Sequence, residues 1–238
     1  MSVRPPNVVR DVGVVIVAGG SSSRTGGKEL KQFRWVAGKP MLLHSLQTFM
    51  ARADVVSVVC VIPREYVGDP PPWIFQCDVD RLLLSVGGRT RTESVSNGLE
   101  DLPNEATIAL VHDAARPLVD DAVIDRVVAG VRVGGGQCVV PTLPVVDTIK
   151  EVDADGRVVR TLDRDRLRRA QTPQGFPRDV IHRIHHEARA AGISATDDAA
   201  LCERLGVAVS TVDGSERAMK VTQEADFERV EALFAASR

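Results

Sequence analysis

Cysteine is scarce in this chain, and the few cysteines that are present are widely spaced. The 238 residues include four cysteines, none of which forms a Cys-x-x-Cys pair. This spacing argues against both a structural zinc site and a disulfide framework. Cys60, Cys138 and Cys202 stand in apolar runs, where cysteine usually serves as a small core residue.

Long apolar runs and an excess of charge are also missing. No run approaches the length of about 18 apolar residues that indicates a transmembrane helix. The apolar run after Asp11 ends in a glycine–serine loop and not in a signal-peptide cleavage site. The formal net charge of −2 gives no sign of bulk binding to nucleic acid or to a membrane. With 44% hydrophobic residues the chain has ample core, and we expect a cytoplasmic globular protein.

Apolar runs and amphipathic segments alternate through the first part of the chain. The expected strands are residues 12–17, 55–62, 81–86, 107–111 and 137–141, and the expected helices are residues 40–52, 91–102 and 120–132. This alternation predicts an α/β fold with a mainly parallel sheet and helices on both faces.

The pattern changes after residue 141. Val145–Lys150 and Arg157–Leu162 both look extended, and the Asp155-Gly156 pair between them is a strong hairpin signal. An isolated two-stranded hairpin is only marginally stable in water, so this one either grips a second subunit as an arm or lies on its own domain. Further helices are expected near residues 178–191, 197–205 and 223–236, and a strand is expected near residues 207–212.

Two loops that follow predicted strands carry residues suited to a polyphosphate. Loop 18–31 combines glycines and serines, which offer donors to an anion, with the cations Arg24 and Lys31. It is neither a Walker A motif nor a GxGxxG motif. The second loop, His112–Pro117, follows strand 107–111, at the edge where open α/β sheets bind ligands. Its Asp113 suits a cation and its Arg116 suits an anion.

The order and spacing of these segments resemble the 2-C-methyl-D-erythritol 4-phosphate cytidylyltransferases, enzymes of the non-mevalonate isoprenoid pathway. The resemblance covers most of the chain and is carried by loop 18–31, Gly87-Gly88 with Arg91, Ser94 and Val95, His112–Pro117, Pro144–Lys150, Asp163-Arg164, Thr172-Pro173-Gln174, Thr196-Asp197 and Lys220-Val221-Thr222. It implies one Rossmann-like nucleotidyltransferase domain over residues 1–238. A protruding β-arm, at about residues 143–170, would form a homodimer and complete the neighbouring subunit's site.

The same resemblance implies a reaction. CTP and methylerythritol phosphate would give the CDP-linked alcohol and pyrophosphate, with Mg²⁺ or another divalent cation as cofactor and with no nucleic acid or membrane as partner. The attacking phosphate monoester is already anionic near neutral pH, since its second pKa is about 6. The reaction therefore needs no general base and no covalent intermediate, and catalysis rests on positioning and on cations at the α-phosphate. His112 would order its loop and transfer no proton.

By matching position, the resemblance implies a role for each site residue. The catalytic cations would be Arg24, Lys31 and Lys220. The CTP-binding residues would be Ala18, Gly19, Gly20, Ser21, Gly88, Ser94, Asp113 and Ala114, with Asp113 also near the metal, indirectly or weakly. The substrate-binding residues would be Thr148, Arg164, Thr172, Thr196 and Arg116, of which Thr148 and Arg164 would reach the other subunit from the arm. Thr148 and Thr172 also fit ordinary strand positions, and Thr196 also fits a helix N-cap.

Three positions depart from the pattern of the family. Ser22 stands where relatives usually have a second glycine, and Arg89 and Arg217 stand where an acid is common. Lys28, in the same loop as Lys31, is an alternative phosphate ligand.

Other functions compete with this interpretation. Cytidylyltransferases for another polyol phosphate, such as ribitol 5-phosphate, share the loop and strand-end motifs, and a non-catalytic nucleotide-binding dimer would share the fold. A short-chain oxidoreductase would need a Tyr-x-x-x-Lys pair, but the only tyrosine, Tyr66, is followed four residues later by Pro70. His182, His185 and His186 share a predicted helix without an HExxH motif, so we expect incidental surface histidines there.

Overall fold

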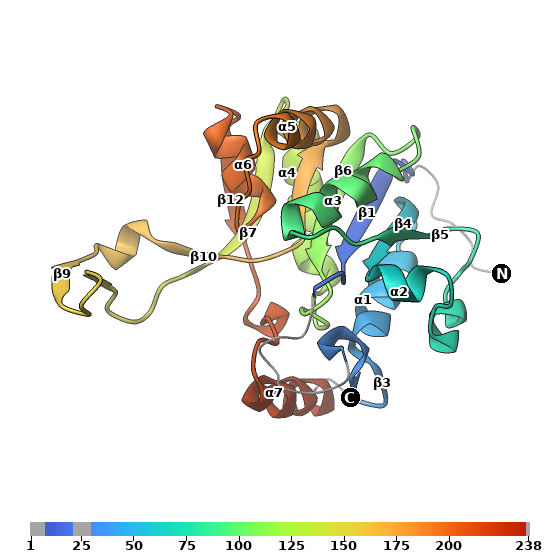
Figure 1. Ribbon diagram of the computed structural model, residues 1–238, viewed down its shortest axis with the longest axis horizontal. Helices are drawn as coiled ribbons and strands as arrows, with labels where there is room; N and C mark the ends of the chain where they lie inside the picture. The colour runs from blue at the N-terminus through green and yellow to red at the C-terminus, as the bar shows by residue number, and fades with distance from the viewer. Residues whose placement is uncertain (1–7, 21–29, 237–238) are drawn as a thin grey trace.

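An eight-stranded sheet forms the centre of the molecule in the computed structural model, which describes residues 8–20 and 30–236 (Figure 1). The strand order is β10-β7-β11-β6-β1-β4-β5, and β12 pairs with β7. The strands are β1 Val12–Val17, β4 Val55–Ile62, β5 Leu82–Val86, β6 Ile108–Asp113, β7 Cys138–Pro144, β10 Arg168–Ala170, β11 Gln174–Pro177 and β12 Val209–Asp213. Pairing is parallel except at β10 and β11, which confirms the predicted α/β class.

Strands β1 and β4 coincide with their predicted ranges because their apolar runs are buried on both faces of the sheet. Strand β6 runs two residues further than predicted, since His112 and Asp113 pair with Ile16 and Val17 of β1. Strands β10 and β11 were not predicted. Strand β11 is four residues long and pairs antiparallel with β6 and β7. It could not be predicted from the sequence, because it is too short to show a periodic pattern and is defined by its pairing with distant strands.

Helices cover both faces of the sheet, as predicted. They are α1 Met41–Met50, α2 Arg64–Val67, α3 Arg91–Glu100, α4 Asp121–Val133, α5 Arg178–Ala190, α6 Asp198–Arg204 and α7 Glu224–Ala235. One core cluster joins α1 and α4 to the sheet, and a second joins α3, α5 and α6 to the opposite face. Strand β1 contributes side chains to both clusters, because Val14 and Ile16 point to one face of the sheet and Val15 points to the other.

Short elements complete the chain. They are the 3₁₀ helices η1 Lys31–Phe33, η2 Pro72–Gln76, η3 Arg164–Arg166 and η4 Glu216–Ala218, and the small β2–β3 hairpin of Trp35–Val36 and Lys39–Pro40. A third apolar cluster packs α7 against β2. That packing brings the segment before α7, residues 220–222, back toward η1, where Lys31 Nζ donates to the carbonyl of Val221.

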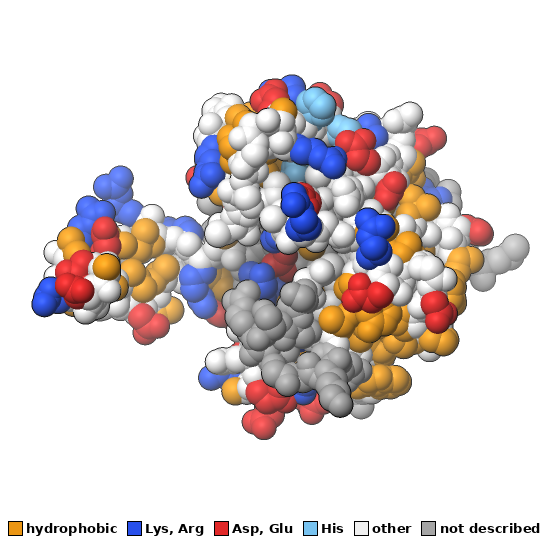
Figure 2. Space-filling model, in the orientation of Figure 1, with side chains coloured by type: hydrophobic (Ala, Val, Ile, Leu, Met, Phe, Trp, Pro, Cys, Tyr) orange, Lys and Arg blue, Asp and Glu red, His pale blue; other side chains and the backbone are white. Residues whose placement is uncertain are grey.

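The predicted hairpin is confirmed, although its first strand begins later than expected. Strands β8 (Lys150–Val152) and β9 (Val158–Thr161) pair antiparallel, and Gly156 takes a φ of +80° in the turn between them. The hairpin belongs to an arm, residues 145–167, which leaves β7, returns into β10 and projects away from the sheet (Figure 1). The arm exposes large apolar side chains, Val146, Val152, Val158 and Val159, among charged ones (Figure 2).

The cysteines behave as their spacing predicted, since all four are free and Cys60, Cys138 and Cys202 are buried. The sulfur atoms of Cys138 and Cys202 lie 3.0 Å apart, between β7 and α6. Within residues 8–20 and 30–236, no helix has both the length and the apolar character needed to cross a bilayer.

Candidate active site

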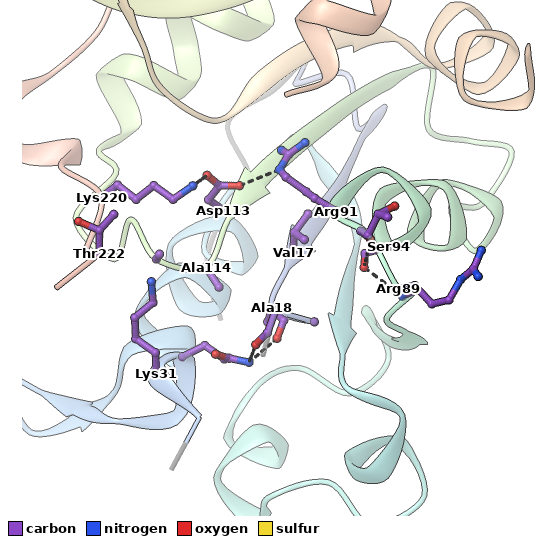
Figure 3. A pocket seen from close by; sticks show the side chains of 16 residues that line it. Val17, Ala18, Lys31, Arg89, Arg91, Ser94, Asp113, Ala114, Lys220 and Thr222 are labelled. Carbon is purple, nitrogen blue, oxygen red and sulfur yellow. Dashed lines mark hydrogen bonds and ion pairs between the residues drawn. The ribbon is translucent and has the colours of Figure 1, made fainter. Parts of the chain in front are cut away.

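A cavity of about 750 Å³ opens at the carboxyl ends of β1 and β6 (Figure 3). Carboxyl ends of parallel strands share one edge of the sheet, so loops far apart in sequence meet there. Nine of the predicted site residues line the cavity: Ala18, Gly19, Gly20, Lys31, Gly88, Ser94, Asp113, Ala114 and Lys220. Ser21 and Arg24, together with Ser22 and Lys28, lie outside the residues that the structure describes.

Cationic side chains outnumber acidic ones in the lining of the cavity. Among the described residues that line it, four side chains are cationic, Lys31, Arg89, Arg91 and Lys220, and one, Asp113, is a carboxylate. Such a surface attracts polyanions and disfavours neutral ligands.

Asp113 lies between two cations. Its Oδ2 atom is 2.7 Å from Lys220 Nζ, and its Oδ1 atom is 3.3 Å from Arg91 Nε (Figure 3). Burial alone would raise the pKa of Asp113, but the charges of Arg91 and Lys220 outweigh this effect and hold the pKa below its usual value. Asp113 is therefore ionised at neutral pH, and Lys220 is held at the cavity.

A chain of buried hydrogen bonds, on the side away from the cavity, fixes the loop that carries Asp113. The Asp113 N–H donates to Thr172 Oγ1 (3.1 Å), and the Thr172 hydroxyl lies 3.1 Å from His112 Nδ1. His112 Nε2 lies 3.3 Å from the Arg116 carbonyl, which can only accept, so the proton sits on Nε2 and Nδ1 accepts from Thr172. Burial lowers the pKa of His112 to about 4, and the imidazole is neutral at pH 7.

Arg116 orders the same loop and does not line the cavity. Its Nη1 donates to the Ala218 carbonyl at 2.7 Å, and its Nη2 donates to the Ala170 carbonyl at 3.3 Å. The buried guanidinium thus ties the end of β6 to β10 and η4. Thr172 is also buried behind Asp113, so these two predicted substrate residues shape the site from outside the cavity wall.

The remaining predicted substrate residues lie elsewhere. Thr148 and Arg164 are exposed on the arm, and Arg164 Nη1 donates to the Val146 carbonyl at 2.6 Å. Thr196 is exposed and precedes α6. The N-cap of that helix is Asp197, whose Oδ1 accepts from the Ala200 N–H at 2.9 Å, so the N-cap alternative for Thr196 is wrong.

Gly88 and Ser94 meet where β5 leads into α3. The Gly88 N–H donates to Ser94 Oγ (3.0 Å), and the Ser94 hydroxyl donates to the Thr90 carbonyl (2.9 Å), so the only proton of Ser94 is already used. A free lone pair on Ser94 Oγ can still accept from a ligand amino group. Arg89, one of the departures from the family pattern, pairs with Glu93 at 2.9 Å on the outer side of this turn.

Gln32 and Arg91 are among the polar residues of the cavity to which sequence reasoning gave no role. Gln32 Nε2 donates to the carbonyls of Ala18 (2.5 Å) and Gly20 (3.3 Å), which fixes the start of the glycine loop. Arg91 was assigned no role, although it belongs to a matching segment. Its partner Asp198 is 107 residues away along the chain, and no local pattern reveals a contact over such a separation.

The donor set for a metal is small. Asp113 is the one carboxylate among the described lining residues, and no group of three or more potential ligand side chains occurs in the described part of the chain. Both Asp113 oxygens already contact cations, but a carboxylate has about four lone-pair sites. The site fits an ion such as Mg²⁺, which typically takes one or two carboxylates and fills its shell with phosphate oxygens and water.

Comparison with known proteins gives a consistent result. The family described as 2-C-methyl-D-erythritol 4-phosphate cytidylyltransferase (IspD) matches residues 12–236. A protein of that name from Frankia casuarinae is 41% identical, over 94% of this chain and 81% of that protein. A bifunctional enzyme IspD/IspF from Rhodopseudomonas palustris is 42% identical over 95% of this chain, which spans 56% of that longer relative. The crystal structure of 2-C-methyl-D-erythritol 4-phosphate cytidylyltransferase from Thermus thermophilus has a TM-score of 0.76 and 33% identity, covering 94% of this chain and 98% of that one.

Proposed function

Because the chain belongs to the 2-C-methyl-D-erythritol 4-phosphate cytidylyltransferase family, we propose that the cavity between β1, β6 and α3 is where it transfers CMP from CTP to methylerythritol phosphate. The chain is a nucleotidyltransferase, and its products are 4-diphosphocytidyl-2-C-methyl-D-erythritol and pyrophosphate. The observation that carries the location is the excess of cationic side chains in the cavity, because both substrates are polyanions.

The transfer is a direct displacement. A phosphate oxygen of methylerythritol phosphate attacks the α-phosphorus of CTP, and the bond from this phosphorus to the α–β bridging oxygen breaks to release pyrophosphate. The attacking oxygen is already anionic near neutral pH, so no side chain has to remove a proton. The chain brings the two anions together and stabilises the charge of the transition state.

Lys31 and Lys220 are the described cations proposed for this role, and Arg24 is a third from outside the described residues. Two contacts support the pairing of the lysines: Lys31 Nζ lies 2.7 Å from the carbonyl of Val221, the residue after Lys220, and Lys220 Nζ is held by Asp113. The backbone of Gly19 and Gly20 approaches the triphosphate.

The proposed cytosine contact is made by Gly88 and Ser94. The Ser94 hydroxyl uses its only proton to donate to the Thr90 carbonyl, so towards cytosine Ser94 Oγ can only accept, and the exocyclic amino group of cytosine is a donor. A keto oxygen at the same position, as in uracil, would face a lone pair. Asp113 and Ala114 adjoin the ribose.

Mg²⁺, or another divalent cation, accompanies CTP in this proposal. Asp113 is the candidate protein ligand, directly or through water, and phosphate oxygens supply the other contacts. When bound, the ion neutralises part of the triphosphate charge. A calorimetric titration of CTP with and without Mg²⁺ tests this point, since equal affinities in both buffers would contradict it.

The arm is proposed to build a homodimer in which Thr148 and Arg164 reach the partner's methylerythritol phosphate. Support comes from the four valines that the arm exposes and from the marginal stability of an isolated hairpin in water. Sedimentation of the full chain tests the dimer. A monomer at micromolar concentration would refute it.

Pyrophosphate release from CTP and Mg²⁺ tests the function, with methylerythritol phosphate, ribitol 5-phosphate or no acceptor. Release with methylerythritol phosphate alone is expected. The comparisons do not favour the ribitol alternative. Release with ribitol 5-phosphate alone would identify that compound as the acceptor substrate, and the reaction would still be a cytidylyl transfer. Loss of turnover in a folded Lys31→Ala variant would exclude the non-catalytic dimer. A cytoplasmic location stays a prediction that cell fractionation tests.

A further inference from the structure

A chain of buried ionic contacts leads from the cavity into the helix layer formed by α3, α5 and α6. Arg91, whose Nε contacts Asp113, also places its Nη1 2.7 Å from Asp198 Oδ2. The other oxygen of Asp198 lies 3.0 Å from His185 Nε2, on α5. The sequence predicted an incidental surface histidine at position 185, and this is wrong, because His185 is 2% exposed.

Asp198 is held rigidly at the N-terminus of α6. It is fully buried, and its backbone N–H donates to Gln174 Oε1 at 3.2 Å, which attaches α6 to β11. Burial alone would raise the pKa of Asp198, but the charge of Arg91 and the His185 hydrogen bond outweigh it, and the pKa is lowered. Asp198 is thus an ionised carboxylate in a fixed place.

His185 serves Asp198 alone within the described residues. A carboxylate can only accept, so His185 Nε2 carries the proton and donates. Its Nδ1 is buried and has no hydrogen-bond partner among the described residues. The bond to Asp198 is therefore the one side-chain hydrogen bond that the imidazole makes among these residues. Together Asp198 and His185 form a rigid acceptor for the guanidinium of Arg91.

The geometry shows which carboxylate sets the position of Arg91. The Asp198 contact is short at 2.7 Å, whereas the Asp113 contact is longer at 3.3 Å. Charge-assisted N–H···O bonds are strongest at about 2.7–2.9 Å. Arg91 is therefore anchored on Asp198 and reaches Asp113 from there. Figure 3 shows the contact between the Arg91 guanidinium and the Asp113 carboxylate, which restricts the rotation of both groups.

We propose that Asp198 and His185 are positioning residues for cytidylyl transfer, which act through Arg91 on the orientation of Asp113. This inference rests on the proposed function, because Asp113 matters only if the cavity holds the nucleotide. Replacing Asp198 by asparagine leaves the shape but removes one buried negative charge. Arg91 then turns toward Asp113 and the triphosphate, so ground-state binding of CTP is kept or strengthened while the catalytic geometry is lost.

Steady-state kinetics of Asp198→Asn tests the proposal. We expect kcat to fall by about 10- to 100-fold, the size typical of a displacement of about 1 Å, while KM for CTP does not rise. The affinity for CTP, measured by calorimetry without the acceptor, should be equal to that of the wild type or higher. A kcat within about threefold of the wild type, or a rise in KM that accounts for the loss, would overturn the proposal.

His185 supplies the rescue experiment. Glutamine can place an amide donor near the position of Nε2, so His185→Gln should retain most of kcat, whereas His185→Leu should resemble Asp198→Asn. Equal activity of the Gln and Leu variants would contradict a role through hydrogen bonding. If His185→Leu does not fold, the split between kcat and KM in Asp198→Asn still decides the matter.

Asp54→Asn is a matched control. Asp54 is also a buried aspartate held by an arginine, Arg52, at 2.8 Å, but it precedes β4 at the opposite edge of the sheet. It should lower thermal stability without changing kcat. A fall in kcat as large as that of Asp198→Asn would show a general stability effect and refute the proposal. Wild-type enzyme without pyrophosphate release would refute the proposed function itself, whereas active wild type with unchanged Asp198→Asn would refute the positioning role alone.

Discussion

Gly88→Ala gives a direct test of how tightly the turn beside the cavity is built. A Cβ atom on Gly88 would lie 2.3 Å from Glu93 Cβ and 3.0 Å from the backbone carbon of Glu93. Carbon atoms in contact normally lie about 3.5–4.0 Å apart. The obstructing atoms belong to the backbone and Cβ of α3 and not to a flexible chain end. The turn must therefore move by about 1 Å.

The energetic cost has two sources. Overpacking of a tight site typically costs about 1–3 kcal/mol. The shift also weakens the hydrogen bond from the Gly88 N–H to Ser94 Oγ, and a typical intramolecular hydrogen bond contributes about 0.5–1.5 kcal/mol. Because these contributions overlap, we expect Gly88→Ala to lower the free energy of unfolding by about 2 kcal/mol. The displaced Ser94 should also lower kcat/KM for CTP by about 10- to 100-fold.

Gly20→Ala is the matched control, since no atom of the described residues lies within 4 Å of a Cβ built on Gly20, another glycine of the cavity. Urea unfolding at 25 °C without nucleotide should separate the two variants, with Gly20→Ala within about 0.5 kcal/mol of the wild type. A Gly88→Ala protein as stable as Gly20→Ala would refute the reasoning. So would unchanged kcat/KM for CTP in Gly88→Ala.

Three further predictions concern the loop below Asp113 and the arm. The native pKa of His112, about 4, lies below its unfolded value of about 6.5, so the unfolded state binds more protons between these values and stability falls as pH drops through this window. From pH 7 to pH 5 the loss attributable to this histidine should be about 2 kcal/mol by urea unfolding, and a pH slope that is unchanged in His112→Gln would contradict it. Thr172→Val leaves the Asp113 N–H and His112 Nδ1 without their partner and should cost about 1–3 kcal/mol, so a Val variant with wild-type stability would show that these bonds contribute nothing. Mixed dimers of Arg164→Ala and Lys31→Ala subunits should recover part of the activity if each site draws on both chains. Absence of recovery in dimers shown to exchange subunits would count against a shared site.

The features that were predicted correctly are those that a few neighbouring residues are enough to specify. Strands β1 and β4 were located to the residue because each is an apolar run buried on both faces. The Asp155-Gly156 pair located the hairpin because its turn requires a positive φ, which glycine adopts without steric cost. The loops after β1 and β6 were placed at one edge because parallel strands end there together.

The features that were missed depend on partners far away in the sequence. Strand β11 forms because it pairs with both β6 and β7 and fills the position between them, and its own residues show no periodic pattern. Its insertion fixes Gln174, which holds the N-terminus of α6 and with it Asp198. His185 looked like a surface residue for the same reason, since its only marker is a carboxylate on another helix.

The sequence by itself determined the class of fold and the cation-rich loops, because apolar runs, glycine turns and lysine side chains can be recognised from neighbouring residues alone. The order of its motifs indicated the kind of chemistry through their resemblance to a known family. The tertiary structure alone decided how those charges are used. In the folded protein the Ser94 hydroxyl donates to the Thr90 carbonyl, and Arg116 donates to two backbone carbonyls outside the cavity. Arg91 lies between the carboxylates of Asp113 and Asp198. Hydrogen bonds and ion pairs are short-range and directional, so which donor meets which acceptor is settled only when the whole sheet and both helix layers have formed.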